Sequence, residues 1–396
     1  MIKAKKNKKT EKEKIAKKVV NSYRGPECII ITGAAGYIGA MLADQFSCSP
    51  DLKEIIAIDR KTIPTLLENN KKVTWIKSEL STGDWRALVA DKKPEVVIHC
   101  AWETKDIYGE EDLQKKLNIE AAENVFDFAF SCPTVKKIIH ISSDMVYGLS
   151  EDNNKNKIFV EGDILRESEY TYGSEKKEVE NILARKYVES NRTKNVFVIR
   201  PSTVFGPRAK YMIEGKGALT TFVNTFSVVP VASEDWGRQY VHEDDLTDIV
   251  AILALNKPPL KGYEVFNVAI NEPVFGKEIA SVLGKEGFYI PPLLIRIAFL
   301  IMWHVFQGKM PTGNGVWKSL SYPMFIDGSK VTKVLRYPYN YSAKETLGGK
   351  IGRYDYAVPK IEEKKEEPPA VEKTEELEED KVSGGEEEIF ELKTKD

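Results

Sequence analysis

Short β-branched apolar runs alternate with longer amphipathic stretches through the first half of the chain. Each run is bounded by polar or glycine-containing segments, and most of the intervals between runs are long enough for a helix. This order predicts a parallel sheet built from strand–helix–strand units, with helices covering both of its faces. The predicted strands are CIIIT, EIIAID, VTWIK, EVVIHC, KIIHIS and NVFVIR, and the clearest predicted helices are 37–46, 111–130 and 172–189.

The alternation loosens after Gly206 into a mixed pattern. We therefore expect an α/β fold, with a doubly wound parallel sheet (Rossmann fold) over residues 26–205 and a smaller mixed substrate-binding region over 206–358. Lysine dominates residues 1–25 and glutamate dominates 359–396, so both ends are predicted to be disordered tails. Ligands of doubly wound sheets bind at the carboxyl ends of the strands, and the chemistry is expected there.

Three glycines, Gly33, Gly36 and Gly39, stand at every third position between the first predicted strand and the first predicted helix. At such a junction the first permits a tight turn, the second lets the backbone approach a pyrophosphate, and the third lets the helix lie close to the sheet. The N–H groups and dipole of a helix that opens with Tyr37 and Ile38 favour the phosphate charge. The pattern predicts a dinucleotide site rather than a flexible loop.

Two residues at the end of the second predicted strand bear on which dinucleotide binds. Asp59 follows Gly39 by about twenty residues, where a carboxylate accepts hydrogen bonds from an adenosine ribose and favours NAD. Arg60 leaves NADP as the less favoured alternative, because a guanidinium beside the ribose can meet a 2′-phosphate.

Tyr172 and Lys176 stand one helical turn apart and project from one face of a predicted helix. A phenol titrates near pH 10, so a tyrosine base needs nearby positive charge. An ammonium beneath the phenol, together with an oxidised nicotinamide ring, would favour the phenolate. Tyr170 is the competing phenol, but no lysine follows it at that spacing.

The motifs G-x-x-G-x-x-G, HISSDMVYG, YGSEK and VIRPSTVFGP occur in this order. With them the chain resembles the extended short-chain dehydrogenase/reductase family, the NAD-dependent epimerase/dehydratase group, over nearly all of its predicted folded part. The resemblance implies an enzyme whose catalytic residues are Ser143, Tyr172 and Lys176. Ser143 would orient the reacting hydroxyl, and Tyr172 and Lys176 would also contact the cofactor.

The same resemblance implies four further cofactor contacts. Glu79 and Leu80 would lie beside the adenine, although Glu79 is one methylene longer than the family's usual aspartate. Ala101 would let the cofactor pass the fourth strand, and Asn118 would approach it from the following helix. For Ala101 and Asn118 a purely structural role is equally compatible with the sequence.

Departures from the family pattern bear on the substrate. Asp144 is followed by Met145 rather than by a second acid, which disfavours dehydration. Thr203 replaces the asparagine of many nucleotide-sugar members, whereas Arg238 is retained and matches a phosphate contact. The predicted substrate contacts are Ser143, Asp144, Thr203 and Arg238.

Composition narrows the class of protein further. The net charge is −2, and the four cysteines and four histidines form neither a C-x-x-C pair nor a cluster, so we expect reduced thiols and no metal site. No secretory signal follows the basic start, and no nucleic-acid partner is expected. We expect a cytoplasmic protein.

The most apolar segment, 290–306, is short for a membrane span and carries Arg296 and His304. Two interpretations are open. The segment is a pocket wall buried against the substrate region, or it is a face for a membrane surface or an apolar substrate.

The leading functional hypothesis is an enzyme that oxidises a secondary alcohol of a nucleotide-sugar-like substrate with bound NAD, in a redox-neutral epimerisation. One alternative is a net NAD(P)-dependent oxidoreductase that acts on a more apolar hydroxy or keto compound. The other alternative is a non-catalytic NAD-binding scaffold. The resemblance also implies a homodimer formed through helices 111–130 and 172–189.

Overall fold

The computed structural model describes residues 25–212, 228–255 and 260–357. The two tails that the sequence predicts to be disordered lie outside the described residues, apart from Gly25.

One parallel sheet of seven strands organises the described part of the chain, in the order β11-β6-β5-β4-β1-β2-β3. The central strand β1 pairs with β2 and β4 on either side, so that Ile30 lies between Ile56 and Val97. All five residues of β1 are buried, because helices cover both faces of the sheet. The strands are β1 Cys28–Thr32, β2 Glu54–Asp59, β3 Val73–Lys77, β4 Val96–His99, β5 Lys137–Ile141, β6 Asn195–Pro201 and β11 Tyr263–Val268.

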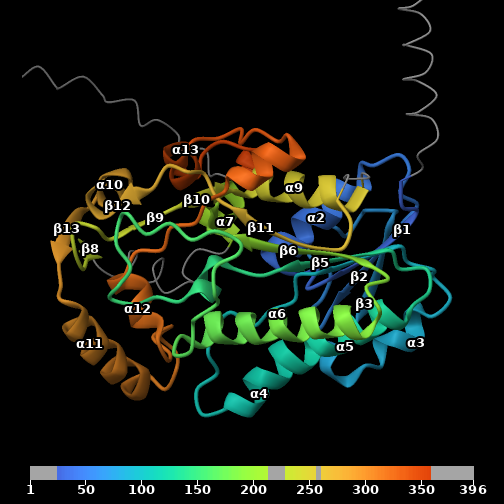
Figure 1. Cartoon of the computed structure of the whole chain (residues 1–396), viewed down its shortest axis with the longest axis horizontal. Helices are drawn as coiled ribbons and strands as arrows, with labels where there is room; N and C mark the ends of the chain where they lie inside the picture. Colours follow the sequence, from blue (N-terminus) through green and yellow to red (C-terminus); the bar gives the residue numbers. More distant parts are fainter. Residues whose placement is uncertain (1–24, 213–227, 256–259, 358–396) are drawn as a thin grey trace, which may run out of the picture. The chain divides into compact units, whose positions relative to one another are not determined.

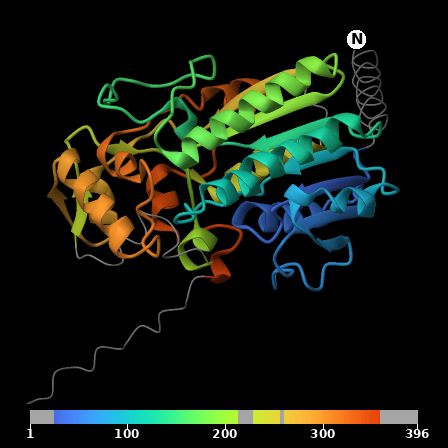
Figure 2. The same cartoon turned by 90° about the horizontal axis from the view of Figure 1, so that it is seen from below.

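Helices pack on each face of this sheet (Figure 1). Side chains of α2 and α9 form one apolar core with Ile29 and Ile31, and side chains of α5 and α6 form the other with Ile30. Figure 2 shows the same layers from below. The helices of this part are α2 Tyr37–Ser47, α3 Trp85–Val89, α4 Glu111–Lys115, the π-helix Lys116–Glu120, α5 Ala121–Ser131, α6 Thr171–Glu189, α9 Glu243–Leu255 and the 3-10 helices Leu80–Thr82 and Asp144–Tyr147.

The predicted doubly wound fold is confirmed, and all six predicted strands are present. Two segments from beyond the predicted boundary at Phe205 also belong to its layers. The strand β11 pairs in parallel with β6 at the edge of the sheet, and α9 packs against α2. The sequence places both in the substrate-binding region, so the two regions are interleaved along the chain.

The remaining elements form a smaller region with mixed strand pairing. Here β7 pairs in parallel with β10, β8 pairs in parallel with β13, and β9 pairs antiparallel with β12. The elements are β7 Thr203–Phe205, α7 Pro207–Met212, β8 Val228–Val231, β9 Gly237–Arg238, β10 Tyr240–His242, β12 Val274–Phe275, α10 Gly276–Val282, β13 Glu286–Tyr289, α11 Pro292–Val305, α12 Val316–Ser321, the π-helix Val331–Leu335, α13 Ala343–Gly348 and the 3-10 helix Asp355–Ala357.

Most of the apolar segment 290–306 forms α11, Pro292–Val305. The pocket-wall interpretation expects this helix to be buried, and most of it is not. Ile295 and Phe299 are buried, but most of the other apolar side chains of the helix are exposed. None of the helices within the described residues combines the length and apolarity needed to cross a membrane.

Candidate functional site

A cleft of about 740 Å³ lies at the carboxyl ends of the central strands. Every residue predicted to contact the cofactor lines it except Asn118. These lining residues are Gly33, Gly36, Tyr37, Ile38, Gly39, Asp59, Arg60, Glu79, Leu80, Ala101, Tyr172 and Lys176. The cleft therefore joins the glycine loop to the predicted catalytic pair.

The glycine loop is shaped by close backbone packing. Gly33 has φ +70°, and a Cβ there would lie 2.5 Å from backbone atoms of Ala101. A Cβ on Gly39 would lie 2.2 Å from the Gly33 carbonyl oxygen, so α2 sits directly on the loop. Gly36 differs from the other two in its surroundings, because it precedes α2 with extended φ and ψ, and a Cβ there would meet only the Gly33 carbonyl oxygen, at 3.0 Å. The Tyr37 hydroxyl donates to Glu243 and ties the start of α2 to α9.

Asp59 holds the loop from the end of β2. It is 9% exposed, and its carboxylate accepts hydrogen bonds from the backbone N–H groups of Ala35 and Lys61. The next residue, Arg60, forms an ion pair with Glu103 at 2.5 Å and lies 4.0 Å from Glu79. The guanidinium is thus shared between two carboxylates at this end of the cleft.

Glu79 and Asn118 both have structural partners. The Glu79 carboxylate accepts hydrogen bonds from the backbone N–H of Leu80 and, at 3.5 Å, of Ser81, at the start of a 3-10 helix. The Asn118 amide is fully buried, pairs with both backbone groups of Glu103, and donates to Glu175. Asn118 thus holds the segment after β4, which forms part of the cleft wall.

The predicted catalytic residues come from two adjacent elements. Ser143 follows β5, where its hydroxyl accepts a hydrogen bond from Met145 N–H and donates to Asp144. Ser143 also lowers the pKa of the Tyr172 phenol, which places the two hydroxyl groups near each other. Lys176 lies one turn after Tyr172 on α6 and is buried. The structure therefore brings all three together.

The lysine points differently from the sequence prediction. Its ammonium donates to the Ile141 carbonyl at 2.7 Å and lies 3.7 Å from the centroid of the Trp102 ring. The Tyr172 ring centroid is 6.0 Å away, so the ammonium is not beneath the phenol. No sequence motif singles out Trp102, although it directly follows Ala101 in the segment after β4.

Burial dominates the electrostatics of this group. It raises the pKa of Tyr172 to about 12, an effect that Asp144 adds to and that the neighbouring Ser143 opposes. It lowers the pKa of Lys176 to about 7, against the charges of Cys100, Glu180 and Glu175. A phenol in these surroundings becomes a base near neutrality only with additional positive charge, as an oxidised nicotinamide would provide.

None of the four predicted substrate contacts, Ser143 included, is among the described residues that line the cleft. Asp144 is 4% exposed, and Thr203 is half-buried in β7. The buried guanidinium of Arg238 donates to the backbone carbonyls of Gly237, Ser319 and Tyr322. It also lowers the pKa of Asp144 against the larger effect of burial, which places these two charges near each other.

We expect the stability of the protein to depend on Asp144 in a pH-dependent way. Burial raises its pKa to about 7, so the folded chain holds a proton between pH 4 and 7 that the unfolded chain releases. The stability that this proton contributes is lost as the pH rises through 7. Asp144→Asn should therefore raise Tm by a few degrees more at pH 8 than at pH 5. Melting curves of this variant and of Asp152→Asn, an exposed neighbour, test this; equal shifts at both pH values would contradict it.

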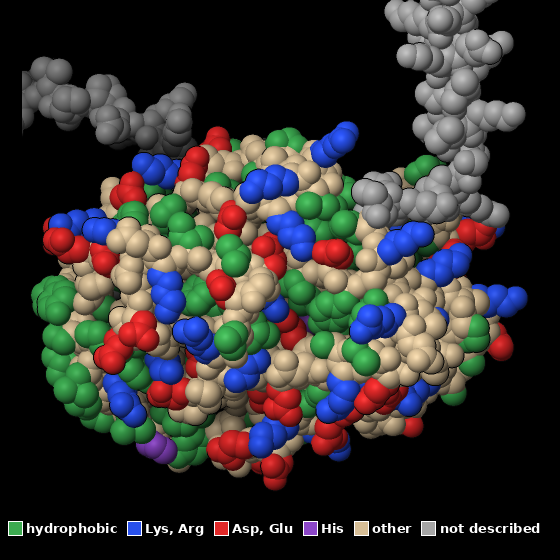
Figure 3. All heavy atoms as spheres, in the orientation of Figure 1, with side chains coloured by type: hydrophobic (Ala, Val, Ile, Leu, Met, Phe, Trp, Pro, Cys, Tyr) green, Lys and Arg blue, Asp and Glu red, His purple; other side chains and the backbone are tan. Residues whose placement is uncertain are grey.

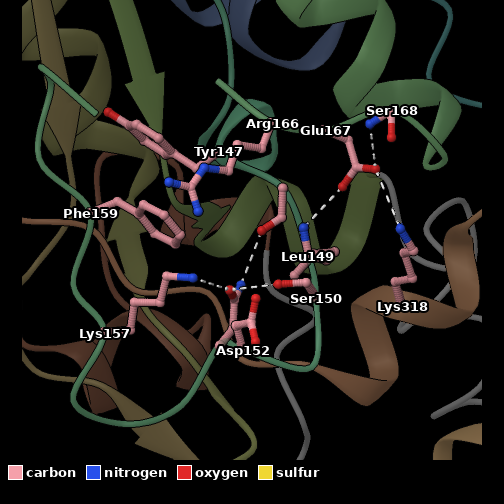
Figure 4. A pocket seen from close by; sticks show the side chains of 12 residues that line it. Tyr147, Leu149, Ser150, Asp152, Lys157, Phe159, Arg166, Glu167, Ser168 and Lys318 are labelled. Carbon is pink, nitrogen blue, oxygen red and sulfur yellow. Dashed lines mark hydrogen bonds and ion pairs between the residues drawn. The ribbon is translucent and has the colours of Figure 1, made fainter. Parts of the chain in front are cut away.

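A second cavity of about 250 Å³ lies beside the start of α6, and Figure 4 shows its lining. Glu167, which is 1% exposed, accepts hydrogen bonds from the backbone N–H groups of Ser168, Glu169 and Tyr170 through one oxygen. Its other oxygen accepts from Leu149 N–H. Glu167 therefore fixes the segment that leads into α6 and is a positioning residue for Tyr172. No sequence motif singles out Glu167; its only signal is an acid four residues before the first residue of α6.

No group of three or more His, Cys, Asp or Glu side chains within the described ranges is arranged to hold a metal ion. Each of the four cysteines is a free thiol.

Comparison with known proteins gives concordant matches. The model of the NAD dependent epimerase/dehydratase family matches residues 29–269. A UDP-glucose 4-epimerase of Mycolicibacterium smegmatis is 24% identical over 278 residues, which are 65% of this chain and 82% of that protein.

Solved structures agree in fold. UDP-glucose 4-epimerase from Thermotoga maritima with UDP-glucose has a TM-score of 0.62 at 20% identity, over 81% of this chain and 96% of that one. UDP-glucuronic acid 4-epimerase from Bacillus cereus, in complex with UDP-glucuronic acid and NAD, has the same TM-score at 20% identity, over 83% and 98%.

Proposed function

The chain belongs to the NAD-dependent epimerase/dehydratase family, and we propose that it uses NAD to epimerise a secondary alcohol of a nucleotide-sugar-like substrate. The observation that carries the proposal is the shared cleft. Tyr172 and Lys176 line it together with the glycine loop and Asp59, and Ser143 is near enough to Tyr172 to lower the pKa of its phenol. Relatives named as 4-epimerases of UDP-sugars support the substrate class.

The residues have complementary roles in this proposal. NAD, when bound, supplies the acceptor for the hydride that leaves the alcohol carbon. Ser143 holds the hydroxyl oxygen by a hydrogen bond. Tyr172 would take the proton of the hydroxyl group and return it to the same oxygen at the end of the reaction. Lys176 adds positive charge near the phenolate, and Glu167 fixes the start of the helix that carries both residues.

The glycine loop fits a pyrophosphate, because all three glycines line the cleft and leave its backbone open to approach. Side chains at Gly33 or Gly39 would also collide with the backbone of the chain. The charges near Arg60 favour NAD over NADP. A 2′-phosphate at this end would meet the carboxylates of Glu79 and Glu103, which already share the guanidinium.

We expect NADP to bind at least ten-fold more weakly than NAD, as measured by isothermal titration calorimetry. Replacing Glu103 with glutamine should reduce that difference in affinity. The substitution removes the ion pair between Glu103 and Arg60, so that the guanidinium can pair with the 2′-phosphate of NADP. Equal affinities for the two dinucleotides in the unmodified protein would contradict the assignment.

Native mass spectrometry tests whether the reaction is redox-neutral. An epimerase retains its cofactor through turnover, so the purified protein should carry close to one NAD per chain, identified after denaturation. If NAD is retained, turnover of UDP-glucose and UDP-glucuronic acid should interconvert C4 epimers without net NADH. Protein that binds neither dinucleotide would overturn the cofactor assignment and the proposed function with it.

A net oxidoreductase is the second candidate, and the surroundings of Arg238 favour it. Its guanidinium is engaged by three backbone carbonyls rather than presented to the cleft. Thr203 also stands in place of the family asparagine. Fewer side chains are therefore available to bind the diphosphate of a nucleotide sugar. A substrate oxidised with stoichiometric formation of NADH, on protein purified without cofactor, would favour this candidate over the epimerase.

A further inference from the structure

The surface of the smaller region carries an apolar face that we call the α11 face. Nine of its side chains are between 45% and 67% exposed, and Figure 3 shows hydrophobic side chains gathered at this side of the molecule. They are Phe288, Tyr289, Leu293, Leu294, Ile297, Leu300, Ile301, Val305 and Phe306. Nine such neighbours exceed the scattered exposed apolar residues that a soluble surface ordinarily carries.

The helix itself is apolar on more than one side. Ile295 and Phe299 point into the core of the smaller region, where they pack with α12, while most of the outward side is also apolar. A helix that is hydrophobic all round is normally covered on all sides. Arg296 and His304 interrupt its apolar surface, and these contact Trp317 and Tyr108 of the chain. The outward face of α11 is therefore one that a further surface would cover.

The charge of the surrounding sequence indicates what covers it. From Gly287 to Ile326 the chain has no aspartate or glutamate, whereas Arg296 and Lys309 are present. The third basic residue of the segment, Lys318, is already paired with Glu169 and Glu167. The whole chain has 60 acidic residues in 396, which would place about six in a segment of this length. An acid-free apolar helix with basic residues beside it is complementary to an anionic lipid surface.

We propose that the α11 face docks on an anionic bilayer surface, with α11 lying in the interfacial plane. A helix of 14 residues is too short to span the hydrocarbon core, but it is long enough to bury one face among headgroups and acyl chains. Phe288 and Tyr289 stand on β13, immediately before α11, and aromatic residues favour this interface.

Vesicle flotation with the full chain tests the proposal. Vesicles of phosphatidylcholine with about 30% phosphatidylglycerol are the probe, and the variant is Ile297→Glu with Ile301→Glu. Both side chains are exposed, so the fold should be kept; the far-ultraviolet circular dichroism spectrum checks this. We expect at least a ten-fold loss of vesicle binding. The matched control is Ile164→Glu with Val188→Glu, two exposed apolar residues elsewhere, which should bind as the unmodified protein does.

Two outcomes would overturn the proposal. Vesicle binding that is unchanged in the Ile297/Ile301 variant but lost in high salt would assign it to the lysine-rich tail rather than to α11. A protein that does not bind vesicles, and whose dimer in light scattering becomes a monomer in the variant, would assign the face to a second copy of the chain. Neither outcome depends on the cofactor, so the proposed function is tested separately.

Discussion

Replacing Tyr172 with phenylalanine is expected to lower turnover by roughly 1,000-fold while NAD remains bound. The substitution removes only the phenol oxygen that takes the substrate proton, and general acid–base catalysis is commonly worth a factor of 10² to 10⁴. The ring keeps its contact with Trp102, and Lys176 keeps its bond to the Ile141 carbonyl, so the cleft wall should be preserved. Initial rates and NAD titrations of the purified variant measure the two effects separately.

Tyr170 offers a matched control for this experiment. Its ring lies 5.9 Å from that of Tyr172, and burial raises the pKa of its phenol as well. No lysine follows it one helical turn later, so Tyr170→Phe should change turnover by less than ten-fold. If Tyr170→Phe abolished turnover and Tyr172→Phe did not, the assignment of the base would be wrong. If both variants kept an unchanged cellular role, the non-catalytic scaffold would be favoured instead.

Much of the fold could be predicted because the central strands are buried on both faces. The sequence of such a strand, for example β1, is a continuous apolar run that can be recognised without knowing which strands pair with it. The edge strand β11 is harder to assign to this sheet from the sequence, because it follows the end of the regular strand–helix alternation. Its partner β6 also lies more than sixty residues earlier in the chain, and no local pattern shows that such distant segments pair.

Some parts of the candidate site could likewise be predicted from the sequence, and others could not. The glycine loop could be predicted because its requirements are local: a turn with positive φ, and a helix that begins close to it. The position of the Lys176 ammonium could not, because Trp102 reaches it from a segment 74 residues away. Arg238 has a phosphate-contact pattern in the sequence, yet α12 and the residue that follows it supply two of the carbonyls that engage its guanidinium.

The three glycines should respond differently to alanine, because only two of them are required by the fold. Gly39→Ala would place a methyl group 2.2 Å from the Gly33 carbonyl oxygen, and backbone on both sides cannot yield without moving α2. We expect a loss of several kcal/mol of unfolding free energy, as for other strained or overpacked backbone sites, together with loss of NAD binding. Gly33→Ala should behave similarly, since it combines a collision with a φ of +70°.

Gly36→Ala separates cofactor binding from folding. Gly36 has a φ of −76°, and an added Cβ would meet only the Gly33 carbonyl oxygen, at 3.0 Å. The fold should tolerate the methyl group with a change in Tm of a few degrees, whereas NAD affinity should fall by at least ten-fold because the pyrophosphate must approach that backbone. Gly162→Ala is the control, because nothing lies near its added Cβ and both readouts should stay unchanged. If Gly36→Ala bound NAD normally, the loop would be a structural turn, and the cleft would need another explanation.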